Sequence, residues 1–472
     1  MTTVVAFPRI IQGGMGVAVS NWKLARAVSL KGQLGVISGT ALDTVLVRRL
    51  QDGDIGGHMR RGIARFPVAG VAEAVLNRYF RPEGRRPDEP YKLIPMYKQR
   101  VSVERQQLTM LANFVEVYLA KEGHSGPVGI NLLTKVEMPN LASLYGAMMA
   151  GVDYVLMGAG IPREIPGVLD AFVEHRSASI RFDVTGLAAG ESEVLSFDPL
   201  EHGVTDGTPL TRPRFIPIIS ASSLATTLAR KANGRVDGFI VEGPTAGGHN
   251  APPRGEPRFN EDGEPVYGER DEVDLAKLRD LALPFWIAGG AGTPERLREA
   301  LNAGATGVQV GTLFAYCQES GFADQLKCDV IERAGRGEVV VMTDPRASPT
   351  GYPFKVVELT PDAETRPRRE RLCDLGYLRA AYQRPDGRID YRCPSEPVKD
   401  YVRKGGTIAE TEGRRCLCNA LLANIGLPQL RAAGETEPPL LTSGDDLETI
   451  SVFLAGRTSY TAADVISYLL GE

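Results

Sequence analysis

The chain has 472 residues, of which 43% are hydrophobic and 24% charged, and its formal net charge is -4. This composition is typical of a globular protein with ample apolar core material, and the mild acidity offers no general attraction to nucleic acid or anionic membrane. No apolar run has the length that spans a bilayer, and the first residues lack the basic start and apolar core of a signal peptide. We therefore expect a cytoplasmic protein.

Short apolar segments that resemble buried strands recur along the chain, and most of them are followed by a helical pattern. The segments are residues 9–12, 34–37, 128–131, 154–157, 215–219, 238–241, 285–288 and 307–310. Helical spacing follows at residues 21–31, 141–150, 164–175, 222–232, 294–303 and 323–333. Eight strands alternating with helices predict an α/β fold of the (β/α)₈ barrel type, although an open doubly wound sheet permits the same alternation.

Two stretches depart from this rhythm. Residues 38–126 are too long for a loop and contain helical patterns at 41–51, 71–79 and 103–121, while residues 179–197 alternate like a hairpin. From about residue 337 the chain is rich in Pro, Gly and charge, with helices expected at 418–425 and 462–470. We interpret residues 1–336 as a barrel with an insertion at about 38–126, and residues 337–472 as a C-terminal extension packed on it.

The segment most suggestive of chemistry is residues 241–255, V-E-G-P-T-A-G-G-H-N-A-P-P-R-G, which follows the sixth strand. Gly247 and Gly248 carry no Cβ and allow close approach of the backbone to a flat or anionic ligand. His249 places a titratable imidazole directly after that point. An ordinary glycine-rich turn with a surface histidine is the alternative, but a loop after a barrel strand lies at the end where such barrels carry their sites.

Glycines also follow other predicted strands. The first strand ends in Gly13-Gly14-Met15-Gly16, the seventh in residues 288–292 (A-G-G-A-G), and the eighth in Gly311-Thr312. Barrel enzymes often bind a phosphate after strands seven and eight, where backbone N–H groups and a helix N-terminus point at the anion. Together with the histidine loop, these glycines predict a phosphorylated cofactor.

These segments resemble the FMN-dependent nitronate monooxygenases, formerly called 2-nitropropane dioxygenases, within a wider group that includes flavin-dependent enoyl-acyl-carrier-protein reductases. The resemblance lies in I-I-Q-G-G-M-G at 10–16, G-I-N-L-L at 129–133, V-E-G-P-T-A-G-G-H at 241–249, A-G-G-A-G at 288–292 and G-V-Q-V-G-T at 307–312. It implies a barrel in which FMN lies across the strand ends, with its phosphate at strands seven and eight.

The resemblance also implies roles for individual residues. His249 matches the family's catalytic histidine, which acts near the flavin on the nitro compound and serves as a base for a neutral nitroalkane. The residues implied to contact FMN are Gly13, Gly14 and Met15, Asn131, Glu242, Gly247 and Gly248, and, at the phosphate, Gly289, Gly290, Gly311 and Thr312.

Two positions depart from the family pattern, which usually has Gln and Glu where this chain has Glu242 and Thr245. A carboxylate at Glu242 would raise the basicity of His249 if it lay close by, or it would accept hydrogen bonds from backbone N–H groups of the loop. The insertion and the extension also exceed the compact family members, and material over the second strand could shape a different substrate pocket.

The most specific function implied is oxidation of alkyl nitronates with O₂. An NAD(P)H-dependent enoyl-thioester reductase of lipid or polyketide metabolism, and a barrel that has lost catalysis and serves as a binding subunit, remain alternatives. We expect a small-molecule substrate and O₂ as partners, neither nucleic acid nor membrane, and leave a homodimer open. Cys373, Cys393, Cys416 and Cys418 lie in the extension and could hold a structural zinc or an iron–sulfur cluster, or be reduced cysteines packed into it. Because their spacing matches no standard ligand motif, no metal is assigned.

Overall fold

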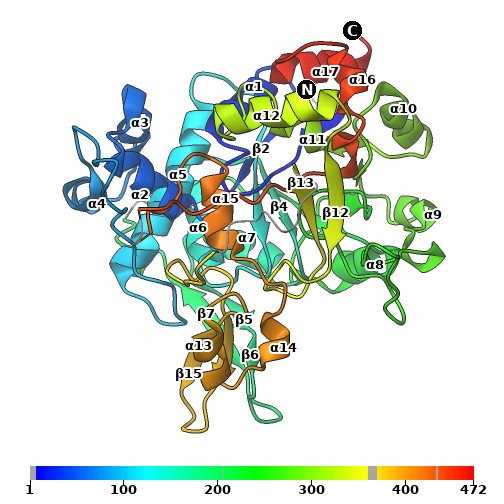
Figure 1. Cartoon of the computed structure of the whole chain (residues 1–472). Coiled ribbons are helices and arrows are strands. Elements are labelled where there is room, and N and C mark those ends of the chain that lie inside the picture. The colour runs from blue at the N-terminus through cyan, green and yellow to red at the C-terminus, as the bar shows by residue number, and fades with distance from the viewer. Residues whose placement is uncertain (1–6, 206, 360–368, 432–433) are drawn as a thin grey trace.

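A closed barrel of eight parallel strands forms the centre of the protein (Figure 1). The computed structural model describes residues 7–205, 207–359, 369–431 and 434–472. The barrel strands are β1 (Ile10–Gln12), β2 (Leu34–Ser38), β3 (Val128–Leu133), β4 (Tyr154–Gly158), β8 (Arg214–Ile219), β9 (Phe239–Glu242), β10 (Phe285–Ala288) and β11 (Gly307–Val310). Because β1 pairs with both β11 and β2, the sheet closes, which confirms the predicted (β/α)₈ fold and excludes the open sheet.

Apolar side chains that alternate along the strands fill the inside of the barrel. This inner cluster comprises Ile11, Leu34, Val36, Tyr154, Leu156, Ile216, Ile240, Trp286 and Ala288. The Trp286 indole is fully buried and donates its N–H to the carbonyl of Pro8, 2.8 Å away. The barrel interior is therefore packed with side chains below the strand ends, and space for a ligand lies above them.

Helices cover the outside of the barrel. Those that the sequence predicted there are α1 (Trp22–Ser29), α6 (Asn140–Met149), α7 (Ile165–Val173), α8 (Ser222–Lys231) and α10 (Pro294–Asn302). The short helices α9 (Leu275–Arg279) and α11 (Thr312–Ala315) were not predicted, and α12 (Asp324–Gly335) forms where a helix was expected. Asn21 and Thr293 cap α1 and α10 by accepting backbone N–H groups, as their positions before these helices suggested. Among the described residues no helix is both long and apolar enough to cross a membrane.

The insertion after β2 is helical, as predicted. It contains α2 (Leu42–Gln51), η1 (Ile55–Gly57), α3 (His58–Ile63), α4 (Val71–Tyr79) and α5 (Val103–Lys121). The long helix α5 packs between the other helices of the insertion and the barrel, in contact with α2, α3 and α4 on one side and α1 and α6 on the other. The insertion is thus joined to the barrel through one buried helix.

The predicted hairpin after α7 is formed by β5 (Ala178–Phe182) and β7 (Glu193–Phe197), which pair antiparallel. Between them, the short strand β6 (Val184–Thr185) pairs with a strand of the extension, β14 (Ala380–Gln383). This pairing attaches the extension to the fourth β/α unit of the barrel.

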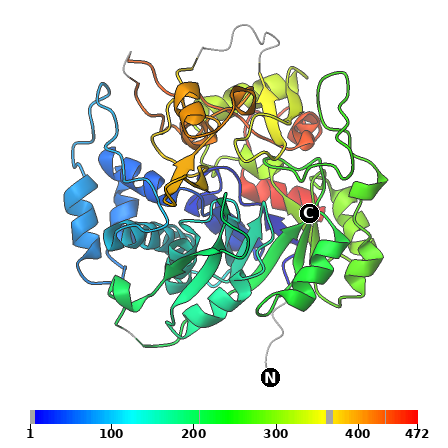
Figure 2. The same ribbon diagram turned by 90° about the horizontal axis from the view of Figure 1, so that it is seen from below.

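The extension contains more strand than the sequence suggested. Its elements are the hairpin β12 (Val340–Asp344) and β13 (Phe354–Glu358), the hairpin β14 and β15 (Ile389–Arg392), α13 (Val398–Arg403), α14 (Ile408–Thr411), α15 (Leu417–Ala423), η5 (Asp445–Leu447), α16 (Ile450–Leu454) and α17 (Ala462–Leu470). Figure 2 shows the orange part of the extension lying apart from the red C-terminal helices, with yellow segments between them.

The last helix of the chain corrects one detail of the predicted barrel. The sequence paired the eighth strand with the helix at 323–333, but α12 packs against α16, whereas α17 contacts α1, α10 and α11. The Tyr460 hydroxyl, just before α17, donates to the carbonyl of Leu313, 2.7 Å away. Because α17 is the more apolar of the two helices along its buried face, it is the one that lies against both α1 and α10.

Candidate active site

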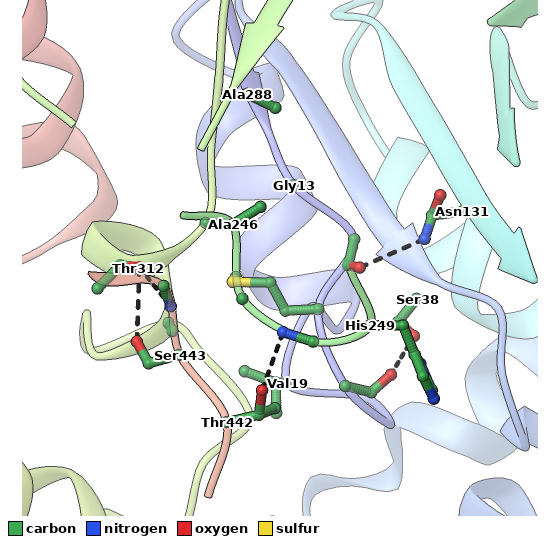
Figure 3. Close-up of a pocket in the computed structure, with 18 of the residues that line it drawn as sticks. Gly13, Val19, Ser38, Asn131, Ala246, His249, Ala288, Thr312, Thr442 and Ser443 are labelled. Carbon is green, nitrogen blue, oxygen red and sulfur yellow. Dashed lines mark hydrogen bonds between the residues drawn. The ribbon is translucent and has the colours of Figure 1, made fainter. Parts of the chain in front are cut away.

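A cavity of about 210 Å³ lies at the carboxyl ends of the barrel strands (Figure 3). Every residue that the sequence assigned to the site lines this cavity: Gly13, Gly14, Met15, Asn131, Glu242, Gly247, Gly248, His249, Gly289, Gly290, Gly311 and Thr312. Asn131 lies on β3 and Glu242 ends β9, and the other residues follow β1, β9, β10 and β11. These strands are neighbours in the closed sheet except for β3. Closure of the barrel is what brings segments 300 residues apart to one place.

His249 is held against the extension. Its backbone forms an antiparallel bridge with Phe354, and its ring meets the Phe354 ring edge to face, with centroids 4.8 Å apart. Its Nε2 atom hydrogen-bonds the Ser348 hydroxyl at 2.6 Å. Burial lowers the pKa of His249 to about 4, so the imidazole is neutral at physiological pH.

The two glycines before His249 lie where the extension segment 442–444 crosses the loop. The Gly248 N–H donates to Thr442 Oγ1 at 2.9 Å, and Gly248 has a φ of +82°. A Cβ on Gly247 would come within 2.7 Å of the carbonyl carbon of Ser443. Glycine at position 247 is therefore required by the extension itself, a reason that the sequence alone did not reveal.

Two amide side chains present unpaired oxygen atoms at the cavity. Asn131 on β3 makes a long hydrogen bond of 3.4 Å from Nδ2 to the carbonyl of Gly14, and its Oδ1 has no partner among the described residues. Gln309 on β11 likewise leaves its Oε1 unpaired. Because buried acceptors are normally satisfied, these two atoms suit a ligand that carries N–H groups, such as a heteroaromatic ring.

The predicted phosphate cradle is bordered by the extension. Gly289 and Gly290 have φ values of +88° and +62°, which favour glycine at the end of β10. Thr312 accepts a hydrogen bond from the Gly444 N–H at 3.1 Å. Asp446 lies against Gly292, since a Cβ on that glycine would come within 2.9 Å of the carboxylate oxygen. An acidic side chain therefore stands beside Gly292, two residues beyond the glycines after β10 that the sequence assigned to a phosphate.

Burial raises the pKa of Asp446, although the Gly292 N–H opposes the shift. A raised pKa reduces the negative charge at the cradle, but the carboxyl still takes up one N–H group that a phosphate would otherwise use. The residues at the cavity therefore fit a flat ring that carries N–H groups. They also fit a phosphate, except that the Asp446 carboxyl occupies one backbone N–H group that the phosphate would use.

Glu242 ends β9 and lies between the main cavity and a smaller pocket lined by Tyr267, Arg254 and Asp271. Its carboxyl makes no hydrogen bond to any described residue, and burial raises its pKa to about 8. Both sequence-based interpretations are therefore wrong. The carboxyl accepts no backbone N–H of the loop, and the pKa of His249 is lowered by burial rather than raised by Glu242.

Several cavity residues were missed by the sequence analysis. They are Ser38, Thr40, Phe354, Leu421, Asn424, Thr442, Ser443, Gly444 and Asp446. Most belong to the extension, more than 100 residues from the glycine loop, and they form no motif with it. The small polar run T-S-G-D-D at 442–446 was the available signal, but such runs usually mark ordinary turns.

The cysteines of the extension lie away from this cavity. Cys373, Cys393, Cys416 and Cys418 line a second, much smaller cavity within the extension. Burial raises the pKa of Cys373 to about 11 and that of Cys393 to about 12, with further contributions from the neighbouring thiols. In the part of the chain that the structure describes, no group of three or more His, Cys, Asp or Glu side chains stands in metal-binding geometry.

Comparison with known families matches residues 189–346 to the family described as Nitronate monooxygenase. The match includes the His249 loop and the ends of β10 and β11, and it confirms the resemblance found in the motifs. Comparison with curated protein sequences returns no match.

Several solved structures are similar in fold. FabK from Thermotoga maritima is 17% identical with a TM-score of 0.48, covering 99% of this chain and 92% of FabK. Nitroalkane oxidase from Streptomyces ansochromogenes is 16% identical with a TM-score of 0.45, covering 98% and 95%. The enoyl reductase domain of MlnA from the macrolactin biosynthesis cluster of Bacillus amyloliquefaciens is 11% identical with a TM-score of 0.44, covering 99% and 94%. At these identities and scores the likenesses carry no information about the substrate.

Proposed function

We propose that this chain, whose residues 189–346 match the nitronate monooxygenase family, is an FMN-dependent oxidoreductase that oxidises alkyl nitronates with O₂. The observation that carries this proposal is the convergence of the family's motif segments on one cavity at the carboxyl ends of the barrel strands. In (β/α)₈ barrels this end carries the active site.

The cavity offers a site for each part of FMN. The backbone at Gly13–Met15 and the unpaired amide oxygens of Asn131 and Gln309 would hold the ring, and the N–H groups after β10 and β11 would hold the phosphate. FMN, when bound, would accept electrons from the substrate and pass them to O₂. No lysine or arginine lines the cavity among the described residues, so the phosphate would depend on backbone donors and on Thr312.

The state of His249 favours an ionised nitronate over a neutral nitroalkane. An imidazole whose pKa lies at about 4 is a weak base at neutral pH and would remove a carbon-bound proton slowly. A nitronate has already lost that proton, so it needs only a hydrogen-bonding partner. His249, oriented by Ser348, and the protonated Glu242 are the candidates for holding the nitronate oxygens.

Anaerobic titration of the FMN-loaded protein with an alkyl nitronate and, separately, with NADPH tests this proposal. We expect the nitronate to bleach the visible flavin absorbance and NADPH to leave it unchanged. Bleaching by NADPH, followed by reoxidation with an enoyl thioester, would assign the chain to the reductase alternative. Failure of the folded protein to take up FMN would instead indicate a binding subunit without flavin chemistry.

A further inference from the structure

Four of the six cysteines gather at one point of the extension although they come from three separate segments. Cys373 precedes β14, Cys393 directly follows β15, and Cys416 and Cys418 stand at the start of α15. All four line the same small cavity, with a volume of about 10 Å³. The remaining two, Cys317 and Cys328, lie on the barrel side of the chain and do not line it.

The four thiols line one and the same cavity, and Asn419, which also lines it, donates from Nδ2 to Cys416 Sγ at 3.5 Å. Mutual proximity of four thiols in a single cavity is not required for packing, since a small apolar side chain fills such a position equally well.

Two buried polar side chains lie beside the thiols in this cavity. Glu396 and Asn419 also line it, are 3% and 1% exposed, and each leaves a side-chain oxygen without a partner among the described residues. The other carboxylate oxygen of Glu396 accepts from Lys404 Nζ at 2.7 Å, and Asn419 Nδ2 donates to Asp374 at 2.6 Å. Both side chains are therefore fixed in place while an acceptor atom stays unpaired, which buried acceptors seldom do.

The surroundings also suit thiolate ligands. Arg379 lines the cavity together with the four cysteines. The Arg371 guanidinium is held nearby through hydrogen bonds to the carbonyls of Pro394 and Thr411. Two guanidinium groups can offset the negative charge that remains when four thiolates surround a divalent ion.

The local fold has the features of a segment that benefits from a metal cross-link. Between residues 372 and 419 the strands have four residues each and the helices no more than seven. Such short elements bury little apolar surface of their own, and structural metals are a common means of holding them together.

We propose that Cys373, Cys393, Cys416 and Cys418 bind one zinc ion as a structural tetrathiolate site. The described side chains are not yet in ligand geometry, so binding requires rotation about their Cα–Cβ bonds to bring the sulfur atoms to about 2.3 Å from the ion. Each thiol that ligates the ion gives up its proton to solvent.

Metal analysis of the purified full-length protein by mass spectrometry tests the proposal directly. We expect about one zinc per chain in the wild type and in the control Cys328→Ser, whose exposed thiol lies on α12. We expect at least a fivefold lower zinc content in Cys393→Ser. Absence of zinc from the wild type would overturn the proposal, and so would iron accompanied by acid-labile sulfide.

Because Cys393→Ser can fail to fold, two measurements on the wild type decide the matter without it. Replacement of zinc by Co²⁺ should produce the intense visible bands of a tetrahedral thiolate complex. A thiol reagent should modify four more cysteines per chain after a chelator is added than before. Equal modification with and without chelator, or a disulfide among the four cysteines by mass spectrometry, would contradict a zinc site.

Discussion

Ser348 Oγ lies 2.6 Å from His249 Nε2, although 99 residues separate the two in the sequence. Ser348 is fully buried and also contacts Thr350 Oγ1 at 2.8 Å, so the hydroxyl has few orientations available. The extension therefore fixes the ring position of the histidine that the glycine loop contributes. The family match ends at residue 346, so His249 lies inside it and Ser348 lies outside it. The position of the candidate catalytic histidine therefore depends on a residue outside the family match.

Ser348→Ala should retain FMN but lower turnover of a nitronate by roughly tenfold, the effect expected when one orienting hydrogen bond is lost. The reason is that the His249 ring would then sample more than one orientation. Steady-state kinetics should show the change in kcat rather than in KM, and Ser348→Thr should restore part of it. Ser223→Ala, on the exposed side of α8, serves as the control. Equal rates in the wild type and Ser348→Ala would argue against a positioning role.

His249→Asn should bind FMN normally and lose turnover by a factor on the order of 10²–10³, as when one preorganised hydrogen-bonding group is removed from an active site. The asparagine keeps a polar group in the loop but cannot reach Ser348 in the same geometry. Flavin content from the visible spectrum and turnover from nitrite release check the two parts separately. A variant with unchanged nitrite release would remove His249 from the mechanism.

The raised pKa of Glu242 predicts that activity falls at alkaline pH. Its pKa is raised to about 8 by burial, so the carboxyl is neutral below that pH and ionised above it. An ionised carboxylate in the cavity repels an anionic nitronate, and kcat/KM should therefore fall as the pH rises through about 8. Glu242→Gln cannot ionise and should lack this limb in a pH profile from 6 to 10. The same alkaline limb in both proteins would assign it to another group.

Asp446→Asn should strengthen FMN binding if the phosphate lies beside Gly292. Removal of a carboxylate near a phosphate should lower the dissociation constant of FMN about tenfold, which corresponds to roughly 1.4 kcal/mol of binding free energy. Riboflavin, which lacks the phosphate, should bind both proteins equally and provides an internal control. Weaker FMN binding by the variant, measured by flavin fluorescence on reconstitution, would place the phosphate elsewhere.

A buried ion pair between α2 and α5 should be important for stability. Arg105 lies 2.7 Å from the Asp43 carboxylate, and Tyr377 of the extension donates a hydrogen bond to the same carboxylate. Both charged side chains are almost fully buried. Asp43→Ala would leave Arg105 unpaired and should lower the free energy of unfolding by about 3–5 kcal/mol. Asp400→Ala removes an exposed ion pair with Arg403 and should change it by less than about 1 kcal/mol.

The same carboxylate gives a pH dependence of stability. Burial alone would raise the pKa of Asp43, but Arg105 and the hydrogen bonds from Tyr377 and Thr109 hold it below its usual value. Its stabilising contribution is then fully present above the unfolded value of about 3.9 and is lost as the pH falls toward the lower folded value. Denaturant unfolding should show the difference between wild type and Asp43→Ala shrinking below pH 4, and a constant difference would contradict this assignment.

Much of the candidate site could be predicted from local patterns. The runs I-I-Q-G-G-M-G and A-G-G-A-G identify strand ends by themselves, because an apolar run followed by glycines describes one strand and its exit. His249 was identified in the same way. The unpaired oxygen of Gln309, by contrast, depends on what surrounds it after folding, and no sequence pattern reports a missing partner.

The sequence by itself determined the eight strands, their helices and the residues at the strand ends, because these features depend on periodicity and turn chemistry within 10–20 neighbouring residues. Only the tertiary structure decided what lies over those strand ends. The contacts of Ser348 with His249, of Gly444 with Thr312 and of α17 with α1 join segments separated by more than 90 residues. Such contacts are selected by the packing of whole elements, so neither partner carries a local mark of the other.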